Sequence, residues 1–359
     1  MKIAELRKKL AEEQLSGLLV TDKINRRYLC GFTGSNGLLL VTEQELRLFV
    51  DGRYTQQAQQ QTKNIEICEL PVGGSLNEAL RPFVKGLALG FEAGTISYQS
   101  FSGFQSLTEE VNGQLVATKN MVEGLRMIKT PEEIQGIKQA AKIADQTLEE
   151  ILPLICTGMT EIELANEIDY RSKKIGSAGP AFETIVASGA RTALPHAHAS
   201  QKEIQANELI MIDFGAIYQG YYSDITRTFA FGEVAGAIKE TYQNVLAAQK
   251  KAIKAVAVGR TLGEIDQTAR EALAQQGLAQ YFSHNLGHGI GLSCHEYPAL
   301  APQEGVIIEK NMTFTVEPGV YLPEAGFGIR IEDDVWVNEA GQAEILTQYT
   351  KEWMEIGSN

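Results

Sequence analysis

The sequence predicts an α/β protein that is divided into two domains, and three observations support this prediction. The chain has 359 residues, of which 44% are hydrophobic, whereas a single domain has roughly 100–200 residues. Short apolar strands alternate with amphipathic helices along the chain. A boundary is visible near residues 119–131, where a marked helix start follows at residues 130–133. We therefore expect one domain at residues 1–122 and a second at residues 123–359.

The first domain begins with an amphipathic helix whose apolar residues share one face: Ile3, Leu6, Leu10 and Leu15. Apolar strands are then predicted at residues 17–21, 38–42 and 46–51, separated by turn-like segments such as residues 31–37. Strand and helix continue to alternate to about residue 118, which is typical of a small α/β domain.

The second domain opens with a helix whose start is well marked. Thr130 can cap the helix, Pro131 suits its first position, and Glu133 completes a capping box. Apolar residues at the helical period extend this helix to about Leu152. Further helices are predicted at residues 161–175, 238–256 and 262–276, and strands at residues 209–215, 225–231, 312–317, 329–332 and 335–338.

Charge and composition exclude several functions. The formal net charge is −13 and no strong basic patch is present, so we expect no nucleic-acid binding. The four cysteines are scattered, which favours reduced thiols over a disulfide framework. The N-terminus has no apolar signal segment, and no stretch approaches the ~18–20 apolar residues of a membrane span. We therefore expect a cytoplasmic protein that does not associate with membranes.

Histidines and acidic residues gather in the second domain. All five histidines lie between residues 196 and 295, although each one alone is equally well explained as a structural residue. Asp213 closes an apolar strand and Asp224 precedes another, and a turn at residues 218–220 could join the two strands as an antiparallel pair. A buried carboxylate is costly unless it is paired or bound to a metal. The alternative is that both aspartates are turn residues.

Two glutamates repeat this pattern, since Glu317 and Glu332 each end an apolar strand. Four carboxylates at neighbouring strand ends need a cation between them, because mutual repulsion would otherwise raise their pKa values. With His288 they form an oxygen-rich set that suits two divalent ions, most favourably Mn²⁺, with Co²⁺, Fe²⁺ or Zn²⁺ as substitutes. Two metals activate water for hydrolysis. No serine or cysteine nucleophile motif is present.

These residues resemble the metal-ligand set of the pita-bread metallopeptidases, a group that includes methionine aminopeptidase, prolidase and aminopeptidase P. The supporting segments are IDFGAIYQGYYSDITRTF, HNLGHGIGLSCHE, TVEPGVYLP and GIRIEDDV, and VASGARTALPHAHAS resembles the branch that cleaves Xaa-Pro bonds. The resemblance covers essentially the whole chain. It implies a creatinase/prolidase-like N-terminal domain, a pita-bread catalytic domain, and attack by a metal-bridging hydroxide on peptides with proline at the second position.

The resemblance also implies a role for each site residue. Asp213 and Asp224 would bind one metal, His288 and Glu317 the other, and Asp224 and Glu332 would bridge both. Glu317 would also shuttle a proton. The remaining implied site residues are a substrate-binding His196, an intermediate-stabilising His295, an active-site His284, and Arg330 close to the metals; His198 is expected to be a bystander.

Several alternatives stay open at this point. Residues 32–37 and 49–54 resemble an Xaa-Pro aminopeptidase more than an Xaa-Pro dipeptidase (prolidase), so the aminopeptidase is the preferred prediction and the dipeptidase the alternative. The same segments are equally well explained as a turn and a strand end. Creatinase and non-catalytic pita-bread binding proteins lack the carboxylate set, which counts against both. A homodimer is implied by the resemblance alone.

Overall fold

The computed structural model describes residues 2–357, which separate into two compact units between Arg126 and Met127. The sequence prediction places the boundary after residue 122, whereas the contacts place it after residue 126, because the short helix α6 (Glu123–Arg126) packs with the first unit. The Arg126 Nη1 donates to Asn25 Oδ1 (2.9 Å), and the Tyr28 hydroxyl donates to the Leu125 carbonyl (3.0 Å).

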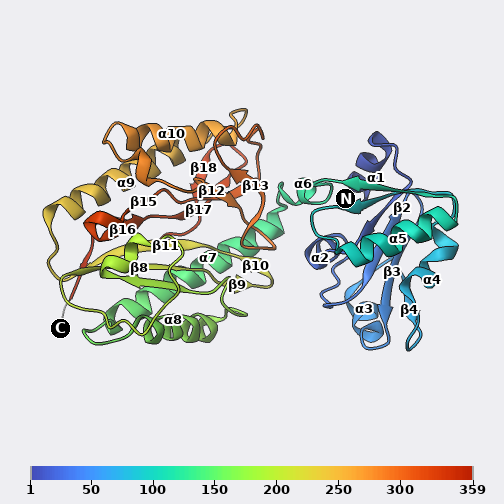
Figure 1. Ribbon diagram of the computed structural model, residues 1–359, viewed down its shortest axis with the longest axis horizontal. Coiled ribbons are helices and arrows are strands. Elements are labelled where there is room, and N and C mark those ends of the chain that lie inside the picture. The colour runs from blue at the N-terminus through green and yellow to red at the C-terminus, as the bar shows by residue number, and fades with distance from the viewer. Residues whose placement is uncertain (1, 358–359) are drawn as a thin grey trace. The chain divides into compact units, whose positions relative to one another are not determined.

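The N-terminal unit is a six-stranded mixed sheet with helices (Figure 1). The strand order is β4-β3-β2-β1-β5-β6, with antiparallel β1–β2 and β2–β3 pairs and parallel β1–β5, β3–β4 and β5–β6 pairs. The strands are β1 (Gly17–Val20), β2 (Leu38–Thr42), β3 (Leu46–Asp51), β4 (Glu66–Leu70), β5 (Ala88–Glu92) and β6 (Gln114–Thr118). The helices are α1 (Lys2–Glu12), α2 (Lys23–Cys30), α3 (Thr55–Gln61), α4 (Leu76–Leu80) and α5 (Tyr98–Glu110).

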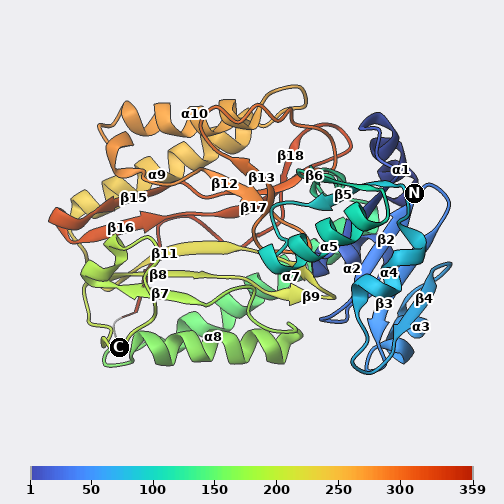
Figure 2. The ribbon, with the colours of Figure 1, turned by 45° about the vertical axis from the view of Figure 1, so that its right-hand side comes forward.

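The C-terminal unit has two halves, each of which combines two helices with a sheet (Figures 1 and 2). In the first half, α7 (Pro131–Ile151) and α8 (Glu161–Ile175) share an apolar core with a sheet of order β19-β11-β8-β7. Its strands are β7 (Ile185–Ser188), β8 (Glu208–Phe214), β11 (Ile225–Phe231) and β19 (Glu355–Ile356).

In the second half, α9 (Gly236–Ala255) and α10 (Leu262–Ala274) share another core with a sheet of order β13-β12-β14-β17-β18. Its strands are β12 (Gly287–Gly289), β13 (Glu296–Leu300), β14 (Thr313–Val316), β17 (Asp333–Val337) and β18 (Ala343–Ile345). Two hairpins complete the unit: β9 (Ile217–Tyr218) with β10 (Tyr221–Tyr222), and β15 (Gly319–Leu322) with β16 (Phe327–Arg330). The two helix pairs flank the strands on opposite sides (Figure 2).

Local sequence signals explain where the helices of this unit begin. Thr130 and Glu133 form the predicted capping box at the start of α7, with Pro131 in the first turn. Thr160 and Thr261 cap α8 and α10 in the same way. No helix among residues 2–357 is both long enough and apolar enough to cross a bilayer, and all four cysteines are free thiols.

The strand predictions on either side of Glu332 are wrong in their bounds, and β17 begins at Asp333 rather than at residue 335. The sequence predicts a strand at residues 329–332 that ends at Glu332, but β16 ends at Arg330. The chain leaves its partner β15 at this point, and the Glu332 N–H donates instead to the Thr226 carbonyl on β11 (3.1 Å). Glu332 therefore lies at a junction between the two sheets, where its side chain reaches groups from both.

Candidate active site

The five predicted ligands come from the two sheets of the C-terminal unit and line one cavity of about 270 Å³. From the first sheet, Asp213 lies on β8 and Asp224 directly precedes β11; from the second, His288 lies on β12, Glu317 directly follows β14, and Glu332 precedes β17. His196, His284, His295 and Arg330 line the same cavity. The structure thus brings together every site residue that the sequence predicts.

Tight backbone geometry aligns the ligand strands. β8 and β11 are antiparallel, as predicted, and pair Asp213 with Thr226. The turn at Gln219 and Gly220 has two positive φ angles, 48° and 76°, which is the type I′ geometry of two-residue hairpins. At Gly215 a Cβ atom would lie 1.9 Å from the Ser223 carbonyl oxygen. Glycine is therefore required where the chain leaves the strand that carries Asp213.

The ligand atoms of Asp224, His288 and Glu332 all lie within 4.8 Å of one another. The His288 Nε2 is 3.6 Å from Asp224 Oδ2 and 3.4 Å from Glu317 Oε1. These distances are longer than hydrogen bonds but short enough for one ion to contact several groups at once. Asp213 lies in the same cavity, with one carboxylate oxygen bound by the Arg330 Nη2.

The imidazole of His288 is oriented to bind a cation. Its Nδ1 lies 3.1 Å from the Gly289 carbonyl oxygen, which can only accept a hydrogen bond, so Nδ1 carries the proton. Burial lowers the pKa of His288 to about 3, so the ring is neutral. The lone pair on Nε2 therefore faces the carboxylates of Asp224 and Glu317, and an ion between them would convert this unfavourable arrangement into coordination.

The carboxylates give a second, independent sign that the site fits metal ions. Three buried oxygens have no hydrogen-bond partner: Asp213 Oδ1, Asp224 Oδ1 and Glu332 Oε1. Within the protein alone, burial and then neighbouring carboxylates raise the pKa values of Asp224 and Glu332 well above their ordinary range, and burial raises the pKa of Glu317 to about 8. Divalent cations would satisfy these oxygens and offset the repulsion.

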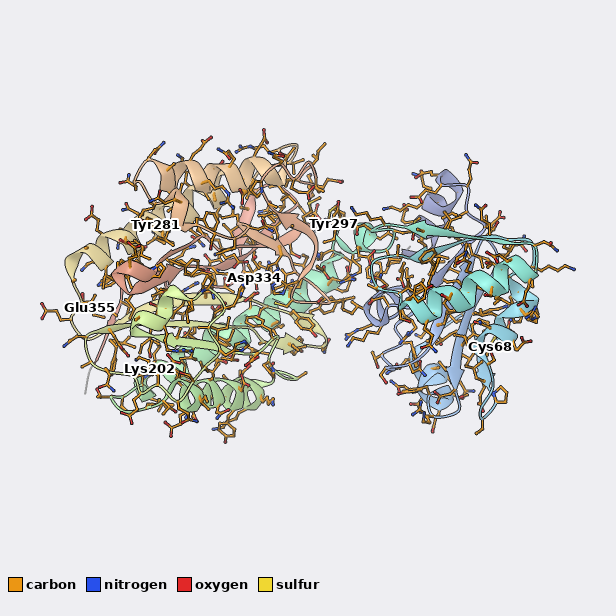
Figure 3. All side chains as sticks on the ribbon, in the orientation of Figure 1. Cys68, Lys202, Tyr281, Tyr297, Asp334 and Glu355 are labelled. Atoms are coloured by element: carbon orange, nitrogen blue, oxygen red, sulfur yellow. The ribbon has the colours of Figure 1, made fainter. Side chains whose placement is uncertain are left out.

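Three residues that the sequence did not point to support the acidic ligand candidates. The Thr226 hydroxyl donates to Glu332 Oε2 (2.6 Å), and the Thr315 hydroxyl donates to Glu317 Oε1 (3.2 Å). Asp334, in the interior of the unit (Figure 3), accepts a hydrogen bond from the Asp224 backbone N–H (3.0 Å). The available signal is spacing: each supporting residue lies two positions from a ligand, on the same face of an extended segment.

Arg330 connects the ligands to the wall of the cavity. Its Nη1 donates to the Tyr321 hydroxyl (2.7 Å) and to the Pro195 carbonyl (2.9 Å), next to His196. The Tyr321 hydroxyl lies 3.0 Å from His284 Nε2, and His284 Nδ1 lies 2.8 Å from the Asn285 carbonyl oxygen. Burial lowers the pKa of His284 to about 4. His284 is therefore a neutral ring with both nitrogens already hydrogen-bonded.

Two other histidines face the cavity more openly. His196 and His295 are exposed residues that line it, and the His295 ring lies against the His288 ring with centroids 3.9 Å apart. His198 does not line this cavity; its Nδ1 lies 2.9 Å from Glu183 Oε1 on the surface.

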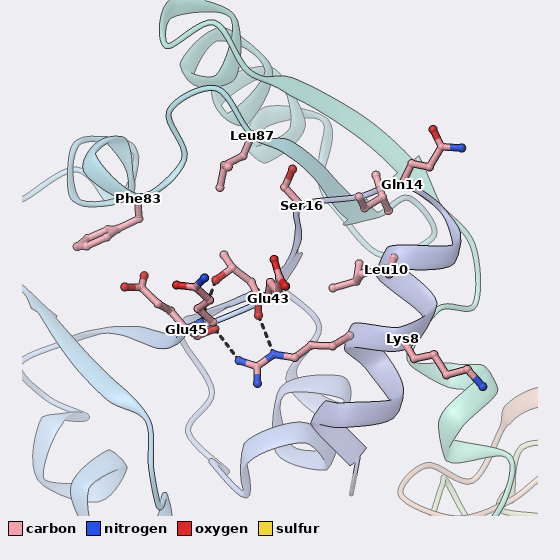
Figure 4. Close-up of a pocket in the computed structure, with 13 residues that line it drawn as sticks. Lys8, Leu10, Gln14, Ser16, Glu43, Glu45, Phe83 and Leu87 are labelled. Atoms are coloured by element: carbon pink, nitrogen blue, oxygen red, sulfur yellow. Dashed lines mark hydrogen bonds between the residues drawn. The ribbon is translucent and has the colours of Figure 1, made fainter.

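A larger cavity of about 760 Å³ lies in the N-terminal unit (Figure 4). It is lined by α1, by the turn between β2 and β3, and by Phe83 and Leu87. Its lining residues include no histidine or aspartate, and the Arg7 guanidinium donates to the backbone carbonyls of Thr42 (2.8 Å) and Glu45 (3.4 Å). It therefore offers no comparable ligand set.

Comparison with known proteins agrees with this geometry. The family described as Metallopeptidase family M24 matches residues 135–339, and the family described as Creatinase/Prolidase N-terminal domain matches residues 2–128. The Xaa-Pro dipeptidase of Pyrococcus furiosus is 35% identical over 352 residues, which cover 98% of this chain and 99% of that protein.

Solved structures show the same similarity. The Xaa-Pro dipeptidase from Bacillus anthracis has a TM-score of 0.93 at 40% identity, with 98% of both chains covered. The X-Pro aminopeptidase from Thermotoga maritima has a TM-score of 0.86 at 38% identity, with 96% of this chain and 98% of that chain covered. The resemblance and the two-part fold that it implies are confirmed: the chain belongs to metallopeptidase family M24 and carries a creatinase/prolidase-type domain before its pita-bread domain.

Proposed function

We propose that this chain is an Xaa-Pro dipeptidase that works with two divalent metal ions. The observation that carries the proposal is the buried set of four carboxylates around one neutral imidazole, in which three carboxylate oxygens have no partner. Such a set is expensive to bury unless it binds cations. Membership of a metallopeptidase family supports the same conclusion.

The donor set supports a two-ion centre. Asp213 and Asp224 would hold one ion, His288 and Glu317 the other, and Asp224 and Glu332 would contact both. Four hard oxygen donors with one imidazole favour Mn²⁺, and Co²⁺, Fe²⁺ or Zn²⁺ can substitute. Bound ions would supply Lewis acidity and lower the pKa of a coordinated water for hydrolysis.

The protein's own residues would divide the remaining work. Glu317 directly follows β14 and lines the cavity, where its carboxylate would accept a proton and return it during hydrolysis. His295 and His196 face the cavity and would contact the substrate carbonyl and backbone. Arg330 holds Asp213 in place and, through the Pro195 carbonyl, also anchors the segment that carries His196.

The relatives favour the dipeptidase over the aminopeptidase that the N-terminal segments had suggested. Proteins named Xaa-Pro dipeptidase match nearly the full length of this chain. The segments that favoured the aminopeptidase form a loop and a strand end with local contacts: Arg26 Nη2 donates to the Gly34 carbonyl (2.7 Å), and Asp51 pairs with Arg53 (2.9 Å). Because the X-Pro aminopeptidase from Thermotoga maritima is also similar, aminopeptidase activity is the second candidate for this chain.

The size of the cavity also suits a short substrate. Its volume of about 270 Å³ lies just below the ~300–1,000 Å³ that small-molecule sites occupy. Phe182, Ile185 and Ala299 add apolar side chains to the lining of the cavity. A dipeptide places one side chain, one scissile bond and one proline ring in such a space.

Parallel hydrolysis of Ala-Pro and Ala-Pro-Ala, each with Mn²⁺ and with EDTA, tests the proposal. We expect cleavage of Ala-Pro with Mn²⁺, loss of that cleavage with EDTA, and little cleavage of the tripeptide. Elemental analysis should find about two metal ions per chain. Cleavage of both peptides would favour the aminopeptidase, and cleavage of neither with Mn²⁺ present would contradict an Xaa-Pro peptidase of either kind.

A further inference from the structure

Cys294 brings a buried thiol against a metal-ligand candidate. Its side chain is buried, and its Sγ lies 3.1 Å from Asp224 Oδ2. Cys294 lies between β12 and β13 of the second sheet, whereas Asp224 precedes β11 of the first. The loop before Cys294 is itself fixed, because the Gly291 carbonyl accepts a hydrogen bond from the Tyr222 N–H (2.8 Å). The contact therefore joins the two sheets at the cavity.

The thiol donates a hydrogen bond to a carboxylate whose orientation few other groups fix. The Asp224 backbone N–H is held by Asp334, but Asp224 Oδ1 is buried without a partner. The terminal torsion of an aspartate is soft, so the carboxylate plane is set by whatever donates to it. A hydrogen bond from the thiol to Oδ2 fixes this plane, keeps Oδ2 3.6 Å from His288 Nε2 and leaves Oδ1 without a protein partner.

The other three carboxylates follow the same rule. Each accepts a side-chain hydrogen bond on one oxygen. The donor is Arg330 for Asp213, Thr315 for Glu317 and Thr226 for Glu332. For Asp224 the donor is a thiol, a weak donor that is strengthened when its acceptor is charged. One donor for each ligand carboxylate is the arrangement that pre-orients a metal site.

We propose that Cys294 is a positioning residue that orients Asp224 and thereby sets the metal affinity of the centre. This inference rests on the metal centre in the proposed function, but it concerns the thiol hydrogen bond alone. Because Asp224 would contact both ions, misorientation of its carboxylate weakens the binding of both. The loss of a supporting hydrogen bond of this kind typically lowers metal affinity by about 10–100-fold.

The test is a titration of EDTA-stripped full-length protein with Mn²⁺, in which free Mn²⁺ is followed by electron paramagnetic resonance. Cys294→Ser keeps a donor, Cys294→Val keeps an apolar side chain without a donor, and Cys294→Ala removes both donor and volume. The control is Cys156→Ala, which removes an exposed thiol away from the cavity. Circular dichroism of each metal-free variant reports whether it is folded.

We expect the serine variant and the Cys156 control to bind Mn²⁺ as the unmodified protein does, and Kd to rise about 10–100-fold in the valine and alanine variants. Unchanged Kd in the folded valine variant would overturn the inference. Equal weakening in the serine and alanine variants would also overturn it, because volume rather than hydrogen bonding would then matter. If the unmodified protein bound no Mn²⁺, the proposed metal centre itself would fail.

Discussion

The histidines of this chain are separated by what their ring nitrogens contact. His284 has both nitrogens hydrogen-bonded within the protein, and His288 has only its Nδ1 occupied, which leaves Nε2 for an ion. His198 pairs with Glu183 away from the cavity. His196 and His295 line the cavity and are the histidines proposed to contact a substrate. Contacts of this kind assign different roles to residues that look alike in the sequence.

At His295 this reasoning gives a direct prediction. We expect His295→Ala to lower kcat for Ala-Pro by ~10²–10³ or more, because it removes a group that would stabilise the developing oxyanion. Its metal content should be unchanged, because His295 is not among the proposed ligands. His198→Ala is the matched control and should keep full activity. Steady-state kinetics with elemental analysis checks both variants, and loss of metal from His295→Ala would contradict the assigned role.

The sequence predicted the residues that line the cavity, whose role as metal ligands stays a proposal, but not the contacts that support them. Acidic residues that end apolar strands are conspicuous, because their burial needs a cation, and Asp213 and Glu317 could be found in this way. Thr226 and Cys294 are uncharged, and threonine and cysteine fit a buried strand or loop without a cation; for Thr226 only its spacing of two positions from Asp224 was available as a signal. Their roles depend on which groups two separate sheets bring together, and this is decided by tertiary packing.

At the scale of elements, local signals determined how well each segment was predicted. The helix expected at residues 161–175 is α8 with the same bounds, because a capping box and a helical period mark it. The strands β12 and β19 were missed because three- and two-residue segments have no periodicity. β19 exists only through its pairing with β11, more than a hundred residues earlier in the chain.

Helix α8 also anchors the segment that carries His196. Glu161 is fully buried at its first turn, where its carboxylate accepts hydrogen bonds from Ser188, Arg191 and Ser200. Two of these donors precede His196 in the chain and the third follows it. One fully satisfied carboxylate therefore fixes the position of a cavity wall.

We expect Glu161→Gln to destabilise the protein by about 1–3 kcal/mol, because the new amide N–H₂ group faces donors and leaves buried partners unsatisfied. KM for Ala-Pro should rise, because the segment that carries His196 loses its anchor. Glu163→Gln is the control, because glutamine also serves in a capping box on the same helix. Urea unfolding and steady-state kinetics would compare the two, and equal behaviour would contradict the anchoring role.

At the scale of the whole molecule, the two halves of the C-terminal unit meet where the four acidic residues of the cavity gather. Asp213 and Asp224 come from one sheet, and Glu317 and Glu332 lie next to strands of the other. Any cation bound between them links the two halves, so metal binding and folding stability are coupled. The implied homodimer stays a prediction, which sedimentation analysis of the purified protein would check.

This coupling predicts how stability depends on pH. Burial raises the pKa of Glu317 from 4.5 to about 8 and also raises those of Asp224 and Glu332. Without metal, the folded state thus holds protons that the unfolded chain releases. The stabilisation from Glu317 is fully present below its unfolded pKa of 4.5 and is lost as pH rises to about 8. Metal-bound protein should not lose this stability as pH rises, because the bound ions neutralise the carboxylates in place of the protons.

The difference in Tm between Mn²⁺-loaded and EDTA-treated protein should therefore widen as pH rises from about 5 to about 8. Differential scanning calorimetry at a fixed Mn²⁺ concentration measures it. In Glu317→Gln this Tm difference should increase less with pH, because the amide does not titrate. In the control Glu163→Gln it should increase as much as in the unmodified protein. A difference that stays constant with pH, or that is larger at pH 5, would show that the buried carboxylates do not exchange protons for metal. It would count against the cation site from which the proposed activity was inferred.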